Sequence, residues 1–102
     1  MKELSVIYNV SVSSEIIDGL ASVGVREYTV IPRCHGRGRV TEPRMDDHVW
    51  PGLNSMLLAV VEDSLAAKAM GKLQELRDGN IGKAGLYAYV KPVESALVPP
   101  RG

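Results

Sequence analysis

The feature that most constrains the fold is a strand, helix, strand pattern that occurs twice within 102 residues. In the first half, residues 4–10 alternate apolar and polar side chains with a period of two, which predicts a strand. Apolar residues at helical spacing then run over residues 16–23, and Gly24 predicts the end of that helix. Residues 25–34 are rich in β-branched side chains and predict a second strand that bends or ends near Pro32.

Both predicted helices are preceded by polar residues suited to capping. Ser11, Ser13 and Ser14 offer side-chain oxygens as N-caps of the first helix. Glu15 lies where a negative charge favours the helix start. Asp63 or Ser64 is expected to cap the second helix in the same way.

The second half repeats the pattern without polar alternation in its first strand. Residues 53–61 are apolar and predict a strand with both faces covered. A helix follows, with Gly79 as its C-terminal stop and Gly71 weakening it without ending it. Its apolar side is expected to comprise Leu65, Ala66, Ala69, Leu73 and Leu76. Residues 86–93 predict the fourth strand.

Two such halves predict an α+β fold, a ferredoxin-like double βαβ sandwich. We expect a single domain over residues 1–95, a long functional loop at 35–52 and a C-terminal tail at 96–102. In this fold the helices cover one face of the sheet, yet the third and fourth strands look apolar on both faces. Covering the second face with other copies of the chain predicts a homo-oligomer.

Composition excludes several classes of function. The 12 basic and 12 acidic residues balance, which removes the global electrostatic argument for nucleic-acid binding. The longest apolar run, residues 56–61, is far short of the ~20 residues that cross a bilayer, so no membrane insertion is expected. The first residues lack the pattern of a signal peptide and there is a single cysteine, which together predict a cytoplasmic protein.

The loop begins with the most unusual stretch of the chain. Four arginines and one acidic residue lie between Arg33 and Arg44, interleaved with glycines. Glycine permits close backbone approach and arginine binds phosphate in a bidentate manner, so the stretch suits an anion such as a nucleotide. The candidate contacts are Gly36, Arg37, Gly38 and Arg39. A solvated loop with the glycines in turns explains the same composition.

A second glycine-rich stretch precedes the last strand. Residues 79–84 lack the spacing and the final Ser or Thr of a P-loop. Gly82 and Lys83 are candidate phosphate contacts, although Gly79 and Gly82 are also explained as a helix end and an easing of the chain into a strand.

The loop also carries side chains that bind metals. Cys34, His35 and His48 are the candidate ligands, and Met45, Asp46 and Asp47 lie near them in the sequence. No closed zinc signature is matched, and a small buried Cys34 with exposed histidines is the alternative. Cys34 and His35 are adjacent and would point to opposite faces of an extended segment, which makes them a poor catalytic dyad. We therefore expect no enzymatic activity.

These stretches together resemble the nitrogen-regulatory PII family and its PII-like relatives. The resemblance rests on the runs 36–39 with Thr41 and Glu42, 50–54, and 82–94. It implies a trimer in which loop 35–52 is the T-loop that contacts a regulated partner, such as a membrane transporter. It also implies ATP or ADP in clefts between subunits, facing the candidate contacts at 36–39 and 82–83. The partner-binding candidates within the loop are Arg44, Met45, Asp46, Asp47 and Trp50.

The chain departs from the classical PII pattern in two places. It has no tyrosine between Tyr28 and Tyr87, so the loop lacks the tyrosine that is uridylylated in the family. The phosphate-binding Gly-Asp-Gly-Lys run is replaced by residues 81–84, Ile-Gly-Lys-Ala. The resemblance is thus to a divergent branch, a trimeric sensor whose effector is an adenine nucleotide, a divalent transition metal, or both. The alternative is a divalent-metal-binding protein similar to the CutA proteins and linked to metal tolerance or efflux.

Overall fold

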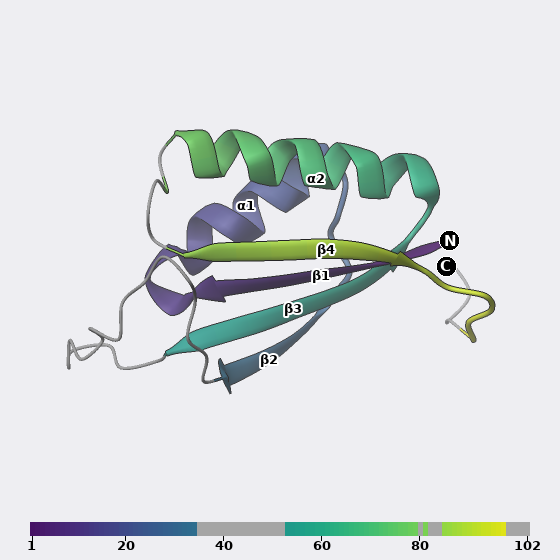
Figure 1. Cartoon of the computed structure of the whole chain (residues 1–102), viewed down its shortest axis with the longest axis horizontal. Coiled ribbons are helices and arrows are strands. Elements are labelled where there is room, and N and C mark those ends of the chain that lie inside the picture. The colour runs from purple at the N-terminus through teal and green to yellow at the C-terminus, as the bar shows by residue number, and fades with distance from the viewer. Residues whose placement is uncertain (35–52, 80, 82–84, 98–102) are drawn as a thin grey trace.

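The computed structural model describes residues 1–34, 53–79, 81 and 85–97, which form a four-stranded sheet and two α-helices (Figure 1). The elements follow in the order β1 (Lys2–Asn9), the short 3₁₀ helix η1 (Val10–Val12), α1 (Ser13–Val23), β2 (Thr29–Cys34), β3 (Asn54–Val61), α2 (Asp63–Asp78) and β4 (Leu86–Pro92). None of the helices in these ranges is long and apolar enough to cross a lipid bilayer.

The sheet is antiparallel throughout, with the strand order β2-β3-β1-β4. Both α-helices lie on the same side of it (Figure 1). This is the predicted α+β, ferredoxin-like double βαβ arrangement, in which the first strand of each half lies at the centre and the second at an edge.

The core lies between the sheet and the two helices. Leu4, Val6 and Tyr8 of β1 are at most 1% exposed because their side chains point toward the helices. Their buried neighbours come from every layer: Ile16, Leu20, Val25, Leu57, Ala59, Ala69 and Leu73. On α2, Leu65 and Leu76 are only partly buried, as expected for residues at the margin of the apolar side.

The helix ends follow the predicted glycines. Gly24 caps α1 with φ of 115°, and its N–H donates to the carbonyls of Leu20 and Ala21. Gly79 caps α2 through bonds to the carbonyls of Glu75 and Leu76, and α2 continues through Gly71 as predicted. Positive φ costs glycine little and other residues more, which is why Gly24 ends the helix so sharply.

The predicted side-chain caps at the helix starts are wrong. The residue before α1 is Val12, which makes no side-chain cap bond, because η1 intervenes between β1 and α1. Asn9 serves η1 instead, accepting the N–H of Ser11 at 2.9 Å. At α2 the capping position is Glu62, without a side-chain bond, and Asp63 lies inside the first turn. Its Oδ1 accepts from the amino group of Met1 at 2.9 Å.

β2 is shorter than the sequence predicts. It begins at Thr29, because Val25 is drawn back against α1, with its N–H bonded to the carbonyl of Leu20 at 2.9 Å. Its register against β3 shifts between Ile31 and Cys34, so the predicted bend near Pro32 is confirmed. Proline has no N–H for the ladder, which favours an irregularity at this place on an edge strand.

Within residues 1–34, 53–79, 81 and 85–97, the helices cover one face of β3. Ser55, Leu57 and Ala59 are buried under the helices, whereas Val60 is 44% exposed on the opposite side. We call that side the open face. Residues that pair in register lie on the same face of the sheet. The residues on the open face are therefore Glu3, Ser5, Ile7, Thr29, Ile31, Met56, Leu58, Val60, Tyr87, Tyr89 and Lys91. Most of these side chains are apolar or aromatic, as predicted, and four of them are well exposed in the described part of the chain: Ile31, Val60, Tyr87 and Tyr89.

Candidate functional site

Most of the predicted site residues lie outside the described residues. These are the nucleotide candidates Gly36, Arg37, Gly38, Arg39, Gly82 and Lys83, the metal candidates His35 and His48, and the loop candidates Arg44, Met45, Asp46, Asp47 and Trp50. The structure does place the residues that flank both segments. Their positions decide whether the two segments start from the same part of the molecule.

The flanking residues meet at one end of the sheet. Cys34, the last residue of β2, pairs with Asn54 at the start of β3, and Asn54 pairs with Asn9 at the end of β1. The N–H of Asn9 donates to the carbonyl of Gly85 at 3.4 Å, just before β4. Residues 34 and 85 therefore lie in one row across the four strands, at the end of the sheet opposite the N-terminus (Figure 1). Segments 35–52 and 82–84 both attach there.

The base of the loop carries unusual backbone geometry. Arg33 has φ of 58°, the one positive value at a non-glycine residue in the described chain. A side chain in the left-handed region is disfavoured by about 1 kcal/mol or more. The next residue, Cys34, donates its thiol to the carbonyl of Ile31 at 3.4 Å, across the register shift. The end of β2 is thus held by a hydrogen bond between two of its own residues, Cys34 and Ile31, at the point where the loop begins.

Of the predicted metal ligands, only Cys34 lies in the described part of the chain. It is partly exposed and not the fully buried cysteine of the alternative interpretation. Across residues 1–34, 53–79, 81 and 85–97 no three side chains of His, Cys, Asp or Glu come together as a metal site. The ligand set Cys34, His35 and His48 stays a prediction.

The same end of the sheet holds a buried tyrosine that the sequence pattern shows only as a core residue. Tyr8 is 1% exposed, and its hydroxyl hydrogen-bonds with the side chains of Ser13 and Ser55. Burial raises the pKa of Tyr8 above its usual value of 10.0, the two serines oppose this rise, and the charge of Tyr28 adds to it. This network joins β1, the start of α1 and β3 beneath the row of flanking residues.

Tyr8→Phe is expected to change how stability depends on alkaline pH. Because its pKa is raised, Tyr8 keeps its phenol proton in the folded chain at pH values where the unfolded chain loses it. The contribution of the Tyr8 hydroxyl to the unfolding free energy is therefore present below pH 10 and lost above it. Removing the hydroxyl should lower the unfolding free energy by about 1 kcal/mol at pH 8, since Ser13 and Ser55 lose a partner. Urea denaturation at several pH values measures both quantities. The difference in unfolding free energy between wild type and Tyr8→Phe should narrow above pH 10. A difference that stays constant with pH would contradict the raised pKa of Tyr8.

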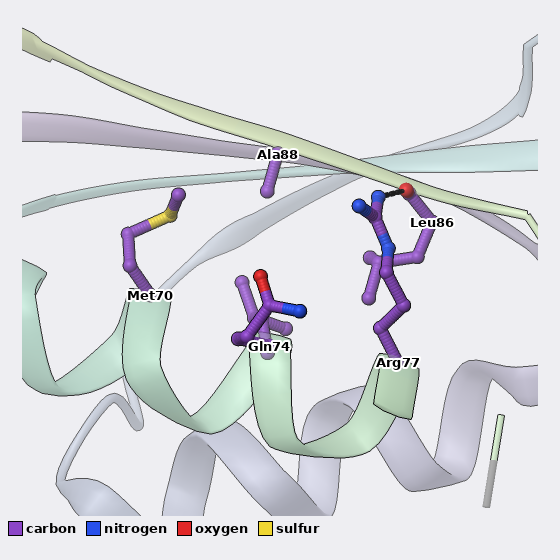
Figure 2. A pocket seen from close by; sticks show the side chains of 6 residues that line it. Met70, Gln74, Arg77, Leu86 and Ala88 are labelled. Carbon is purple, nitrogen blue, oxygen red and sulfur yellow. Dashed lines mark hydrogen bonds between the residues drawn. The ribbon is translucent and has the colours of Figure 1, made fainter. Parts of the chain in front are cut away.

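A shallow depression of about 60 Å³ lies between α2 and β4 (Figure 2). Arg77 extends along it from the last turn of α2 and donates to the carbonyl of Leu86 at the start of β4. Ligand pockets usually measure about 300–1,000 Å³, so this depression is too small for a nucleotide. Arg77 instead holds Leu86, the second residue after segment 82–84, against the end of α2, a role that only the three-dimensional structure reveals.

Comparison with known proteins gives a family. The sequence matches the family description "Nitrogen regulatory protein P-II" over residues 1–99. No curated protein sequence matches significantly.

Solved structures show the same fold at low sequence identity. The CPII protein of Thiomonas intermedia K12, a nitrogen regulatory PII-like protein bound to ADP, AMP and bicarbonate, superposes with a TM-score of 0.72 and 17% identity, covering 96% of this chain and 94% of that one. CPII bound to ADP and bicarbonate superposes with a TM-score of 0.67 and 21% identity, covering 88% of this chain and 82% of that one. A PII-like signaling protein of Thermus thermophilus superposes with a TM-score of 0.61 and 20% identity, covering 88% of this chain and 83% of that one. From the match that spans nearly its whole length, the chain belongs to the nitrogen regulatory protein P-II family.

Proposed function

We propose that this protein is a trimeric PII-like regulator that binds an adenine nucleotide and controls a partner protein through loop 35–52. PII-like proteins are regulators that act on partner proteins and are generally not enzymes. A membrane transporter is the kind of partner we propose, and the cytoplasm is the proposed compartment. The observation that carries the proposal is the meeting of residues 34 and 85 at one end of the sheet.

The trimer is supported by the open face. Tyr87 is 61% exposed, Val60 44% and Ile31 43%, and all three lie on this face. Contiguous exposed apolar surface of this kind marks an association site in a protein with few other ways to bury it. Packing three copies through this face would cover the side chains that the helices of one chain do not reach.

Nucleotide binding is supported by the chemistry of the two segments that start from the same end. One contributes Arg37 and Arg39 between glycines, and the other contributes Gly82 and Lys83. Guanidinium and ammonium groups neutralise phosphates, and glycines expose backbone N–H groups to them. The relative CPII is bound to ADP and AMP. We propose the same class of ligand here, with bicarbonate as a second compound to test.

The experiment is calorimetric titration of the purified protein with ATP, ADP, AMP and bicarbonate. Arg37→Ala and Lys83→Ala should each weaken nucleotide binding at least about tenfold, since each removes a charged phosphate contact. Lys68→Ala, on the exposed side of α2, is the matched control and should bind as wild type does. Equal affinity of all four proteins would refute the site, and no binding by wild type would refute nucleotide sensing.

Mass measurement and thermal melts complete the test. Light scattering should give three times the chain mass of 11.0 kDa for wild type and for the binding variants. If the midpoint of the melt rises with copper, zinc, nickel or cobalt and not with nucleotides, the effector is a metal and the binding residues are assigned to Cys34, His35 and His48. In that case the triple variant Cys34→Ser, His35→Ala, His48→Ala should lose the rise.

A further inference from the structure

Two consecutive residues at the end of β1 are bonded to the ends of both candidate nucleotide segments. The N–H of Asn9 donates to the carbonyl of Gly85 at 3.4 Å, and the N–H of Val10 donates to the carbonyl of Leu53 at 3.1 Å. Leu53 is the first residue after segment 35–52, and Gly85 is the first residue after segment 82–84. One short stretch of backbone therefore holds the chain where each segment returns to the sheet.

The side chain of Asn9 sets the direction of this stretch. Asn9 has extended backbone, with φ of −71° and ψ of 137°, and its Oδ1 accepts the N–H of Ser11 at 2.9 Å. An asparagine that bonds the backbone two residues further on turns the chain at that point. The 3₁₀ helix η1 therefore begins at Val10, and its first N–H is directed at the carbonyl of Leu53.

The described residues on both sides of segment 82–84 are also held. Gly85 has φ of 93°, a conformation that glycine adopts readily and other residues rarely do. The carbonyl of the next residue, Leu86, accepts from Arg77 of α2. On the other side of the segment, Ile81 is buried at 6% exposure. The bond from Asn9 to Gly85 thus joins this part of the molecule to the end of β1.

A ligand that contacts two segments at once depends on the spacing between them. When the spacing that allows binding is populated for only a fraction of the time, the apparent affinity falls by that fraction. The proposed nucleotide contacts come from Arg37 in one segment and Lys83 in the other. A residue that fixes both attachments can therefore control the affinity without touching the nucleotide.

We propose that Asn9 is a positioning residue for nucleotide binding. Its side chain holds the end of β1 in the conformation that bonds to Leu53 and Gly85 together, and so keeps the two segments at the spacing that one phosphate chain can bridge. This inference rests on the proposed nucleotide site, and it goes beyond that site by naming a residue outside both segments.

The test is calorimetric titration of the full chain with ADP. Asn9→Ala removes the acceptor of the Ser11 N–H and should raise the Kd about tenfold, if the held conformation is then populated about a tenth of the time. Asn9→Ser restores a neutral acceptor oxygen and should bind within about twofold of wild type. Ser11→Ala is the matched control, because it changes an exposed hydroxyl and keeps the N–H that donates to Asn9.

Val10→Pro tests the same arrangement through the backbone. Proline has no N–H for the carbonyl of Leu53, yet it is accepted at the first position of a helix, and Asn9 already has the extended backbone that a residue before proline needs. This variant should weaken ADP binding in the same direction as Asn9→Ala. Circular dichroism and light scattering show whether each variant keeps its fold and mass. Should Asn9→Ala fail to fold, Val10→Pro takes its place.

A double-variant cycle with Lys83→Ala separates positioning from a general loss of structure. Once the contact that Asn9 positions is removed, Asn9→Ala should raise the Kd by less than about threefold. The same tenfold loss in both backgrounds would overturn the role of Asn9, and so would an Asn9→Ser variant as weak as Asn9→Ala.

The titration of wild type distinguishes the two levels of the proposal. If wild type binds ADP and both Asn9→Ala and Val10→Pro bind it equally well, the positioning role is overturned and the nucleotide site stands. If wild type binds no ADP, the nucleotide site and the positioning role are overturned together.

Discussion

Leu57→Ala is expected to lower the unfolding free energy by about 3 kcal/mol. Leu57 is 0% exposed and lies on the central strand β3, paired in register with Val6 on one side and Val30 on the other. Truncation removes buried methyl groups and leaves a cavity that neighbours on both strands and the helices cannot collapse to fill. Urea denaturation followed by circular dichroism measures the loss.

The chain offers a matched control for this substitution. Leu97 is 102% exposed in the tail, so Leu97→Ala makes the same chemical change without a cavity and should alter stability by less than about 0.5 kcal/mol. All proteins are compared at one chain concentration, because association through the open face would make stability concentration-dependent. Equal losses for the two leucines would contradict the assignment of Leu57 to the core.

Gly24→Ala is expected to lower the unfolding free energy by about 1–3 kcal/mol, the second-largest effect. Gly24 has φ of 115° at the end of α1, a conformation that residues with a Cβ rarely adopt. A Cβ added there would also lie 3.3 Å from Leu65 Cδ1 of α2. The variant must either keep a strained backbone or unwind the last turn of α1.

The opposite sign is expected for the same change at Gly71. This residue is exposed in the interior of α2, and nothing lies within 4 Å of a Cβ added there. Gly71→Ala should therefore raise stability by up to about 1 kcal/mol through helix propensity alone. Thermal and urea denaturation of both variants tests the pair. A stabilised Gly24→Ala, or a Gly71→Ala that loses stability, would show that the two glycines have been assigned the wrong roles.

Element order and helix ends were within reach of the sequence, because they depend on local periodicity. The pattern of two strand, helix, strand halves predicted the sandwich, and Gly24 and Gly79 marked the helix ends. The capping serines were misread for a local reason as well. A 3₁₀ turn of three residues after Asn9 carries no periodic signal, and it moves the start of α1 past Ser11.

The candidate site was predictable only in part. Glycines and arginines marked the segments 36–39 and 82–83, since their chemistry is visible in the sequence. The sequence could not show that residues 34 and 85 share one row, because that depends on the pairing of strands far apart in the chain. Arg77 and the hydroxyl of Tyr8 were missed for the same reason. A surface-looking arginine and a core-looking tyrosine acquire their partners only through long-range packing.

The sequence by itself determined the architecture, through hydrophobic periodicity and a few glycines that act over one or two turns. It also determined that the sheet would have two apolar faces. Only the tertiary structure decided which face the helices cover and which stays open, because that choice depends on strand order and register. It likewise placed Glu3 beside Lys91, 88 positions apart in the chain, at one end of the open face. A hydrophobic pattern specifies how much surface is to be buried, whereas pairing across the sheet specifies which side chains meet.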